Sequence, residues 1–134
     1  MIIHKNEKLQ CKLNTLKLEK IRHHIFLCCN QTNPRCCSKN TGMASWEYLR
    51  TRLNELNLTG VGGIYQTKVD CLRICYQGPI AIVYPRGIWY HSCNLDVIEK
   101  IIQNHFIGGK PVEENILFKK NENQYPFEKI NKYS

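Results

Sequence analysis

Cysteines are the residues of this 134-residue chain whose type and spacing best support chemistry. Cys71 and Cys75 lie four positions apart in the run C-L-R-I-C, and the turn Q-G-P that follows stops any helix. As thiolates, two cysteines on one turn supply half of a site for a soft metal. The other half has to come from an earlier group, which consists of Cys28, Cys29, Cys36 and Cys37.

The spacing of these cysteines favours an iron–sulfur cluster over a zinc ion. Structural zinc sites are built from two C-x₂₋₄-C pairs, and only Cys71 and Cys75 have such a spacing. The earlier group offers only adjacent or wide spacings. A [2Fe–2S] cluster is wider than one ion and accepts a pair of ligands separated by a long loop. A zinc-bound interaction module is the alternative.

The composition of the chain restricts the compartment and the kinds of partner that are expected for such a site. The chain has eight cysteines and no recognisable secretory signal, which favours metal or redox chemistry in the cytoplasm or an organelle stroma over secretion. No apolar run approaches the roughly 20 residues of a membrane helix, so no membrane association is expected. The net charge of +8 is spread along the chain, and nucleic-acid binding is not favoured because no basic run stands alone.

The cysteine groups have to be positioned by a small α/β domain. Apolar periodicity predicts the order strand, helix, strand, hairpin, helix, at 24–29, 42–57, 64–69, 80–91 and 95–106. This order predicts a mixed central sheet of about four strands, flanked by two main helices on its faces. Each cysteine group follows the C-terminal end of a strand. If those strands are parallel neighbours, both groups emerge at one end of the sheet.

Both termini are expected to lie outside this domain. We assign 1–21 to a basic N-terminal extension, 22–117 to the domain and 118–134 to a polar C-terminal tail. Three leucines, Leu13, Leu16 and Leu18, predict at most a marginal helix in the extension.

Four segments carry a more specific signal. They are H-I-F-L-C at 24–28, R-C-C-S-K at 35–39, C-L-R-I-C-Y-Q-G-P-I-A-I-V-Y-P-R-G-I-W-Y at 71–90 and H-F-I-G-G-K-P-V-E at 105–113. Together they resemble the thioredoxin-like [2Fe–2S] ferredoxins. The resemblance covers roughly residues 22–117. It implies a thioredoxin-like fold and a small one-electron carrier that is not itself an enzyme and often forms a homodimer.

The resemblance also implies a ligand set. Carried over, the four ligands of the [2Fe–2S] cluster are Cys28, Cys37, Cys71 and Cys75. Cys36 is the alternative to Cys37, which is favoured because the second ligand typically opens the segment leading into the first helix. A second interpretation is an electron-transfer subunit of a larger complex, because the thioredoxin-like subunit of NADH dehydrogenases and hydrogenases has similar cluster loops.

Basic residues lie in or beside the ligand loops, namely Arg35, Lys39, Lys68 and Arg73. They predict a basic docking face for a redox partner with an acidic patch. Of the remaining cysteines, Cys29 should point away from Cys28, Cys93 should pack as a small apolar residue, and Cys11 should be exposed. The histidines show no shared ligand spacing, and we expect them at the surface or at helix caps.

Overall fold

The computed structural model describes residues 6–29, 38–74 and 76–120. Within these residues the strands form one five-stranded sheet in the order β2-β1-β3-β4-β5. The strands are β1 (His23–Cys28), β2 (Ile64–Val69), β3 (Ala81–Tyr84), β4 (Ile88–Tyr90) and β5 (Ile116–Phe118). β1 and β2 are parallel, and the other pairs are antiparallel. The mixed sheet is therefore confirmed.

One strand more is present than the sequence predicted. β5 has only three residues and pairs with β4 at the edge of the sheet, with a register irregularity at Trp89 and Tyr90. A three-residue apolar run followed by Lys, Asn and Glu is too short to show the alternation that predicts a strand. Its pairing with β4 decides that it is a strand.

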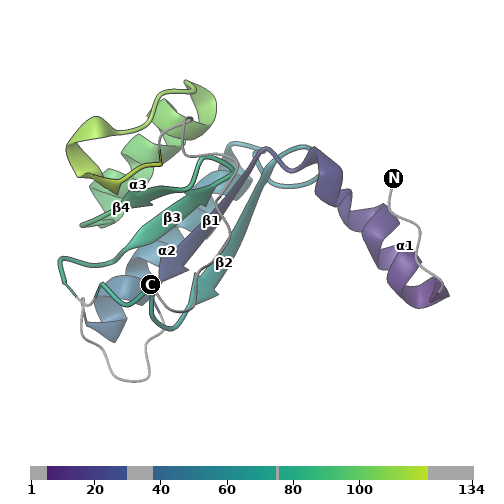
Figure 1. Ribbon diagram of the computed structural model, residues 1–134, viewed down its shortest axis with the longest axis horizontal. Coiled ribbons are helices and arrows are strands. Elements are labelled where there is room, and N and C mark those ends of the chain that lie inside the picture. The colour runs from purple at the N-terminus through teal and green to yellow at the C-terminus, as the bar shows by residue number, and fades with distance from the viewer. Residues whose placement is uncertain (1–5, 30–37, 75, 121–134) are drawn as a thin grey trace, which may run out of the picture.

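The helices flank this sheet and extend from it (Figure 1). They are α1 (Glu7–Leu16), η1 (Leu18–Lys20), α2 (Lys39–Glu55), α3 (Leu95–Lys100), the π-helix η2 (Ile101–Ile107) and η3 (Glu113–Asn115). α3 and η2 are continuous and together match the second predicted helix. Figure 1 shows α1 standing away from the rest of the molecule. None of the described helices is long and apolar enough to cross a membrane.

Both main helices contribute to one core on a single face of the sheet. Alternate strand residues such as Ile25, Leu27 and Val83 point into this core and are fully buried. α2 supplies Leu49 and α3 supplies Ile98 from the other side. Residues of the opposite parity lie on the second face, which neither α2 nor α3 covers. Period-two alternation along the strands therefore separates a covered face from an uncovered one.

α2 and α3 are joined by a polar clamp as well as by the core. The carboxylate of Glu99 on α3 accepts hydrogen bonds from Arg52 Nε at 2.7 Å and from the Tyr48 hydroxyl at 2.8 Å. Gln103 donates to the same carboxylate at 2.8 Å. The hydrogen bond from Arg52 holds the pKa of Glu99 down at about 2. The two helices are therefore held in register.

Candidate metal centre

Parallel pairing of β1 and β2 brings the two cysteine groups to one end of the sheet. Cys28 is the last residue of β1 and pairs with Val69, the last residue of β2. Cys71 follows Val69 by two positions. The prediction that the groups emerge together is confirmed for Cys28 and Cys71, because their strands are parallel neighbours joined through α2.

Cys28 lies under a small apolar cluster on the face that α2 and α3 leave uncovered. Its side chain is 1% exposed and contacts Ile80, with Val69, Leu72 and Trp89 packed around them. The backbone N–H of Ile80 donates to Cys28 Sγ at 3.1 Å. A hydrogen bond to sulfur stabilises negative charge on it, so this position suits a thiolate ligand.

Cys71 is exposed and has the same kind of partner. The backbone N–H of Arg73 donates to Cys71 Sγ at 3.2 Å, across a turn in which Arg73 has a φ of 67°. Two backbone hydrogen bonds fix the far end of the loop, because Ser92 N–H donates to the Gln77 carbonyl at 2.7 Å and Cys93 N–H donates to the Pro79 carbonyl at 2.9 Å. The loop thus holds one sulfur at the surface while its end is tied to the β4–α3 connection.

The first turn of α2 lies against the end of β1. A Cβ added at Gly42 would come within 2.8 Å of Cys29 Cα and of the Cys29 carbonyl oxygen, so only glycine permits this close approach. Ser38 caps the helix by accepting a hydrogen bond from Thr41 N–H at 3.0 Å. The positive end of the α2 dipole therefore faces the cysteine end of the sheet, where it favours an anionic group.

Two of the four predicted ligands fall outside the described residues. They are Cys37 and Cys75, together with the alternative Cys36 and the nearby Arg35. Cys37 immediately precedes the cap residue Ser38 in the sequence. Among residues 6–29, 38–74 and 76–120, no group of three or more His, Cys, Asp or Glu side chains is placed to hold a metal ion. The ligand set as a whole thus stays a prediction.

The remaining described cysteines behave as predicted. Cys29 belongs to the main core, on the opposite face from Cys28, and burial raises the pKa of its thiol to about 11. Cys93 is fully buried in the same core, and burial raises its pKa above the usual range. Cys11 is exposed on α1. Cys28 at the end of β1 and Cys29 just after it are therefore distinguished by the pleat of the chain.

The prediction of surface or capping roles is wrong for His105. Its side chain is 1% exposed, and Nδ1 forms a 2.7 Å hydrogen bond with the Tyr90 hydroxyl. The ring of His23 meets it edge-on, with centroids 5.1 Å apart. Burial lowers the pKa of His105 to about 4. The π-helix η2 carries this residue, and no spacing in the sequence signals its burial.

Sequence reasoning also missed two backbone groups at the cysteine end. The amides of Ile80 and Arg73 donate to the two sulfurs, yet every residue except proline carries such an amide. The available signal was the turn chemistry of 71–79, with its glycine and proline, which indicates a folded loop but not the direction of its N–H groups.

The geometry described above can be compared with known proteins. No protein-family model matches the chain. A 2Fe-2S ferredoxin of Clostridium pasteurianum is 35% identical over 98 residues, which make up 69% of this chain and 92% of that protein. The chain belongs to the thioredoxin-like [2Fe–2S] ferredoxin family.

Further comparisons agree with this ferredoxin assignment. A 2Fe-2S ferredoxin of Aquifex aeolicus is 28% identical over 104 residues, 72% of this chain and 89% of that protein. The solved structure of a thioredoxin-like [2Fe–2S] ferredoxin from Aquifex aeolicus superposes with a TM-score of 0.63 at 25% identity, over 75% of this chain and 94% of that chain. The predicted thioredoxin-like fold is therefore confirmed.

Proposed function

We propose that this ferredoxin is a small one-electron carrier that holds a single [2Fe–2S] cluster through Cys28, Cys37, Cys71 and Cys75. The observation that carries the proposal is the pair of sulfurs at one end of the sheet, each accepting a backbone N–H. A bound [2Fe–2S] cluster supplies reversible transfer of one electron.

The protein's own groups fit such a cofactor. The hydrogen bonds to Cys28 and Cys71 stabilise negative charge on sulfur, which favours the reduced state and raises the reduction potential. The apolar side chains around Cys28 exclude water from one ligand. Arg73 is exposed beside Cys71 and adds positive charge at the surface. The site supports electron transfer without a catalytic group of its own, and we propose a carrier that is not an enzyme.

The test of this function is the visible spectrum of anaerobically purified protein, with iron and acid-labile sulfide measured on the same sample. Cys28→Ser and Cys71→Ser should each lose most of the cluster. Cys29→Ser is the matched control, because it changes the neighbouring cysteine on the opposite face of the sheet. The same assay on Cys36→Ser and Cys37→Ser decides which is the ligand. A colourless protein that contains zinc, or loss of the cluster in Cys29→Ser, would contradict the proposal.

We propose that redox partners approach a basic face around the ligand loops, where Lys39, Lys68 and Arg73 are exposed. Two small oxidants of opposite charge test this sign. Oxidation of the reduced protein by anionic ferricyanide should slow as salt rises, and oxidation by a cationic cobalt hexaammine should not slow. The reverse pattern would show an acidic face.

We propose that the protein works in the cytoplasm or an organelle stroma, because eight cysteines without a recognisable secretory signal favour metal or redox chemistry over disulfides.

We also propose a homodimer that covers the second face of the sheet. His24 and Phe26 stack on this face with centroids 4.0 Å apart, Tyr84 meets Phe26 edge-on, and Tyr84 is 44% exposed. A face of aromatic side chains favours a second copy of the same surface. Tyr84→Arg should convert a dimer into a monomer in sedimentation equilibrium. Leu95→Arg, which is equally exposed on the helical side, should leave the dimer intact.

A further inference from the structure

The helix α1 has strong local signals, but among the described residues only its C-terminal end lies beside the domain. Asn6 caps its start by accepting a hydrogen bond from Leu9 N–H at 3.0 Å, and Lys17 ends it in a left-handed conformation with a φ of 52°. None of its ten residues is buried. A helix of this length is marginal in water by itself, so binding to a partner would stabilise it.

One side of α1 carries a leucine stripe. Leu9, Leu13 and Leu16 are spaced i, i+4 and i+7, which places them on one face of a helix. Leu9 is 44% exposed and Leu16 is 43% exposed. This spacing is the one by which an amphipathic helix anchors itself in an apolar groove of another protein.

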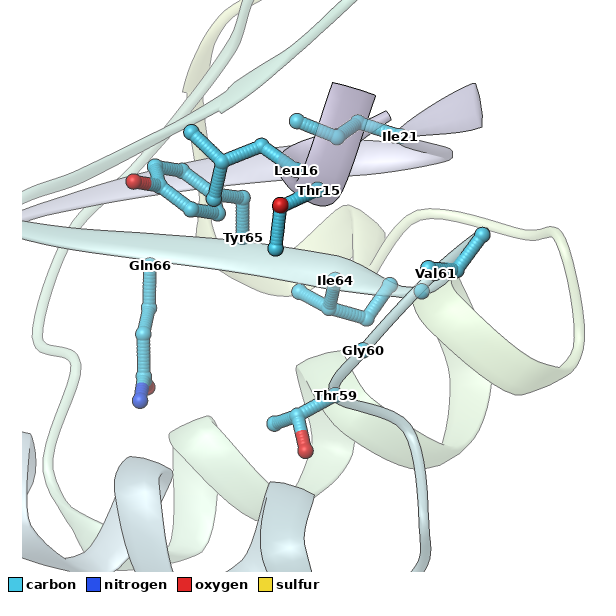
Figure 2. Close-up of a pocket in the computed structure, with 10 residues that line it drawn as sticks. Thr15, Leu16, Ile21, Thr59, Gly60, Val61, Ile64, Tyr65 and Gln66 are labelled. Carbon is cyan, nitrogen blue, oxygen red and sulfur yellow. The ribbon is translucent and has the colours of Figure 1, made fainter. Parts of the chain in front are cut away.

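The stripe continues into a groove at the base of the helix. The groove has a volume of about 360 Å³ and lies between the end of α1 and the edge strand β2. Its apolar walls are Leu16, Ile21, Val61, Ile64 and Tyr65. Figure 2 shows Leu16 and Tyr65 next to one another on the same side of β2, with Val61 at the other end of the view. Leu16 belongs to both the stripe and the groove, so the two form one apolar surface.

The charge of this segment selects the kind of partner. Residues 6–22 contain five basic side chains (Lys8, Lys12, Lys17, Lys20, Arg22) and two acidic ones (Glu7, Glu19), which gives five minus two, or +3. Two such segments repel one another, which disfavours a second copy. Helices that lie in a membrane surface build their apolar face from Trp, Phe and Leu, and α1 presents leucines without either aromatic residue.

We propose that α1, its leucine stripe and the groove at its base bind an acidic protein whose own apolar groove is rimmed by carboxylates. The extension joins the domain at the start of β1, the end of that strand opposite Cys28. A partner held there leaves the cysteine loops uncovered. Binding through α1 would then raise the local concentration of that partner without occupying the ligand end.

The size of the relatives is consistent with an added docking element. The 98 residues shared with the Clostridium ferredoxin fill 92% of that protein but only 69% of this chain. The shared domain therefore does not need all of this chain, and an exposed, capped helix outside the core is the described segment best suited to a separate role.

Calcium-loaded calmodulin is a suitable probe, because its apolar grooves have acidic rims and close when calcium is removed. The full-length holoprotein should bind it with a Kd on the order of 10 μM in calorimetry, and binding should disappear with EDTA. Leu9→Gln should weaken binding at least about tenfold, and the weakening should grow when Leu13→Gln is added. Leu18→Gln is the matched control, since Leu18 is 41% exposed but lies outside α1.

Several results would overturn the proposal. Equal binding by the wild type and Leu9→Gln, binding that survives EDTA, or no binding at all would each do so. Binding to vesicles that contain phosphatidylglycerol, abolished by Leu9→Gln, would make a membrane the occupant instead. Dissociation of a dimer by Leu9→Gln would make it a second copy. The visible spectrum should be unchanged in all these variants, so failure here is separate from failure of the proposed cluster.

Discussion

The two ends of β1 carry different chemistry on one rigid strand. At its C-terminal end, Cys28 lies beside a loop whose exposed Cys71 and backbone amides leave sulfur accessible to a ligand. At its N-terminal end, His23 meets the buried ring of His105, which is bonded to Tyr90. The comparison shows that reactive residue types form a ligand site only where the fold leaves their side chains accessible. At the cysteine end the chain leaves the Cys71 sulfur exposed, and at the histidine end it packs its ring nitrogens into the core.

The largest effect is expected at the junction of α2 with the cysteine end. Gly42→Ala places a Cβ within 2.8 Å of the Cys29 backbone, so α2 has to move away from β1. We expect a loss of about 1–3 kcal/mol in the free energy of unfolding and a lower iron content. Urea unfolding and an iron assay measure both. Thr51→Ala changes an exposed residue of the same helix and should alter neither the stability nor the iron content. An unchanged iron content in Gly42→Ala would show that the position of α2 does not affect cluster binding.

A smaller effect is expected at the histidine end, and it depends on pH. The pKa of His105 is about 4 in the folded protein against 6.5 ordinarily, so the unfolded chain takes up this proton first as the pH falls. The stability that neutral His105 contributes is therefore complete above pH 6.5 and is lost as the pH falls towards 4.

The variant His105→Gln should remove this dependence. Between pH 7.5 and 5.5 its unfolding free energy should fall by about 1 kcal/mol less than that of the wild type. Urea titrations at the two pH values provide the measurement, and His91→Gln is the control at a half-buried histidine. If the unfolding free energies of the two variants change equally with pH, His105 is not the buried neutral histidine described above. The visible spectrum at pH 7.5 should match the wild type in both.

The smallest effect is expected between the ends, at the clamp of the two helices. Glu99→Gln removes the charge that Arg52 holds at 2.7 Å, but both side chains are partly exposed and solvent screens their attraction. We expect a Tm lower by about 2–4 °C and an unchanged spectrum. Gln103→Ala, which removes a weaker partner of the same carboxylate, should lower the Tm less. A change in the spectrum of Glu99→Gln would mean that the clamp also positions the cysteine loops.

Much of the cysteine end was readable from the sequence. A strand, a helix and a second strand in succession predict parallel neighbours, and that rule placed Cys28 and Cys71 together. Strand alternation separated Cys28 from Cys29. The choice between Cys36 and Cys37, and the position of Cys75, fall outside the described residues and stay predictions.

The sequence by itself determined the order of the main strands and helices, and it predicted that both cysteine groups share one end of the sheet if β1 and β2 are parallel neighbours. These follow from periodicity and chain connectivity, which are local or topological rules. Only the tertiary structure decided that both main helices cover one face, that β5 joins the edge, that His105 is buried, and which amides point at sulfur. Each of these depends on contacts between segments distant in sequence, whose free energies no local pattern of residue types records.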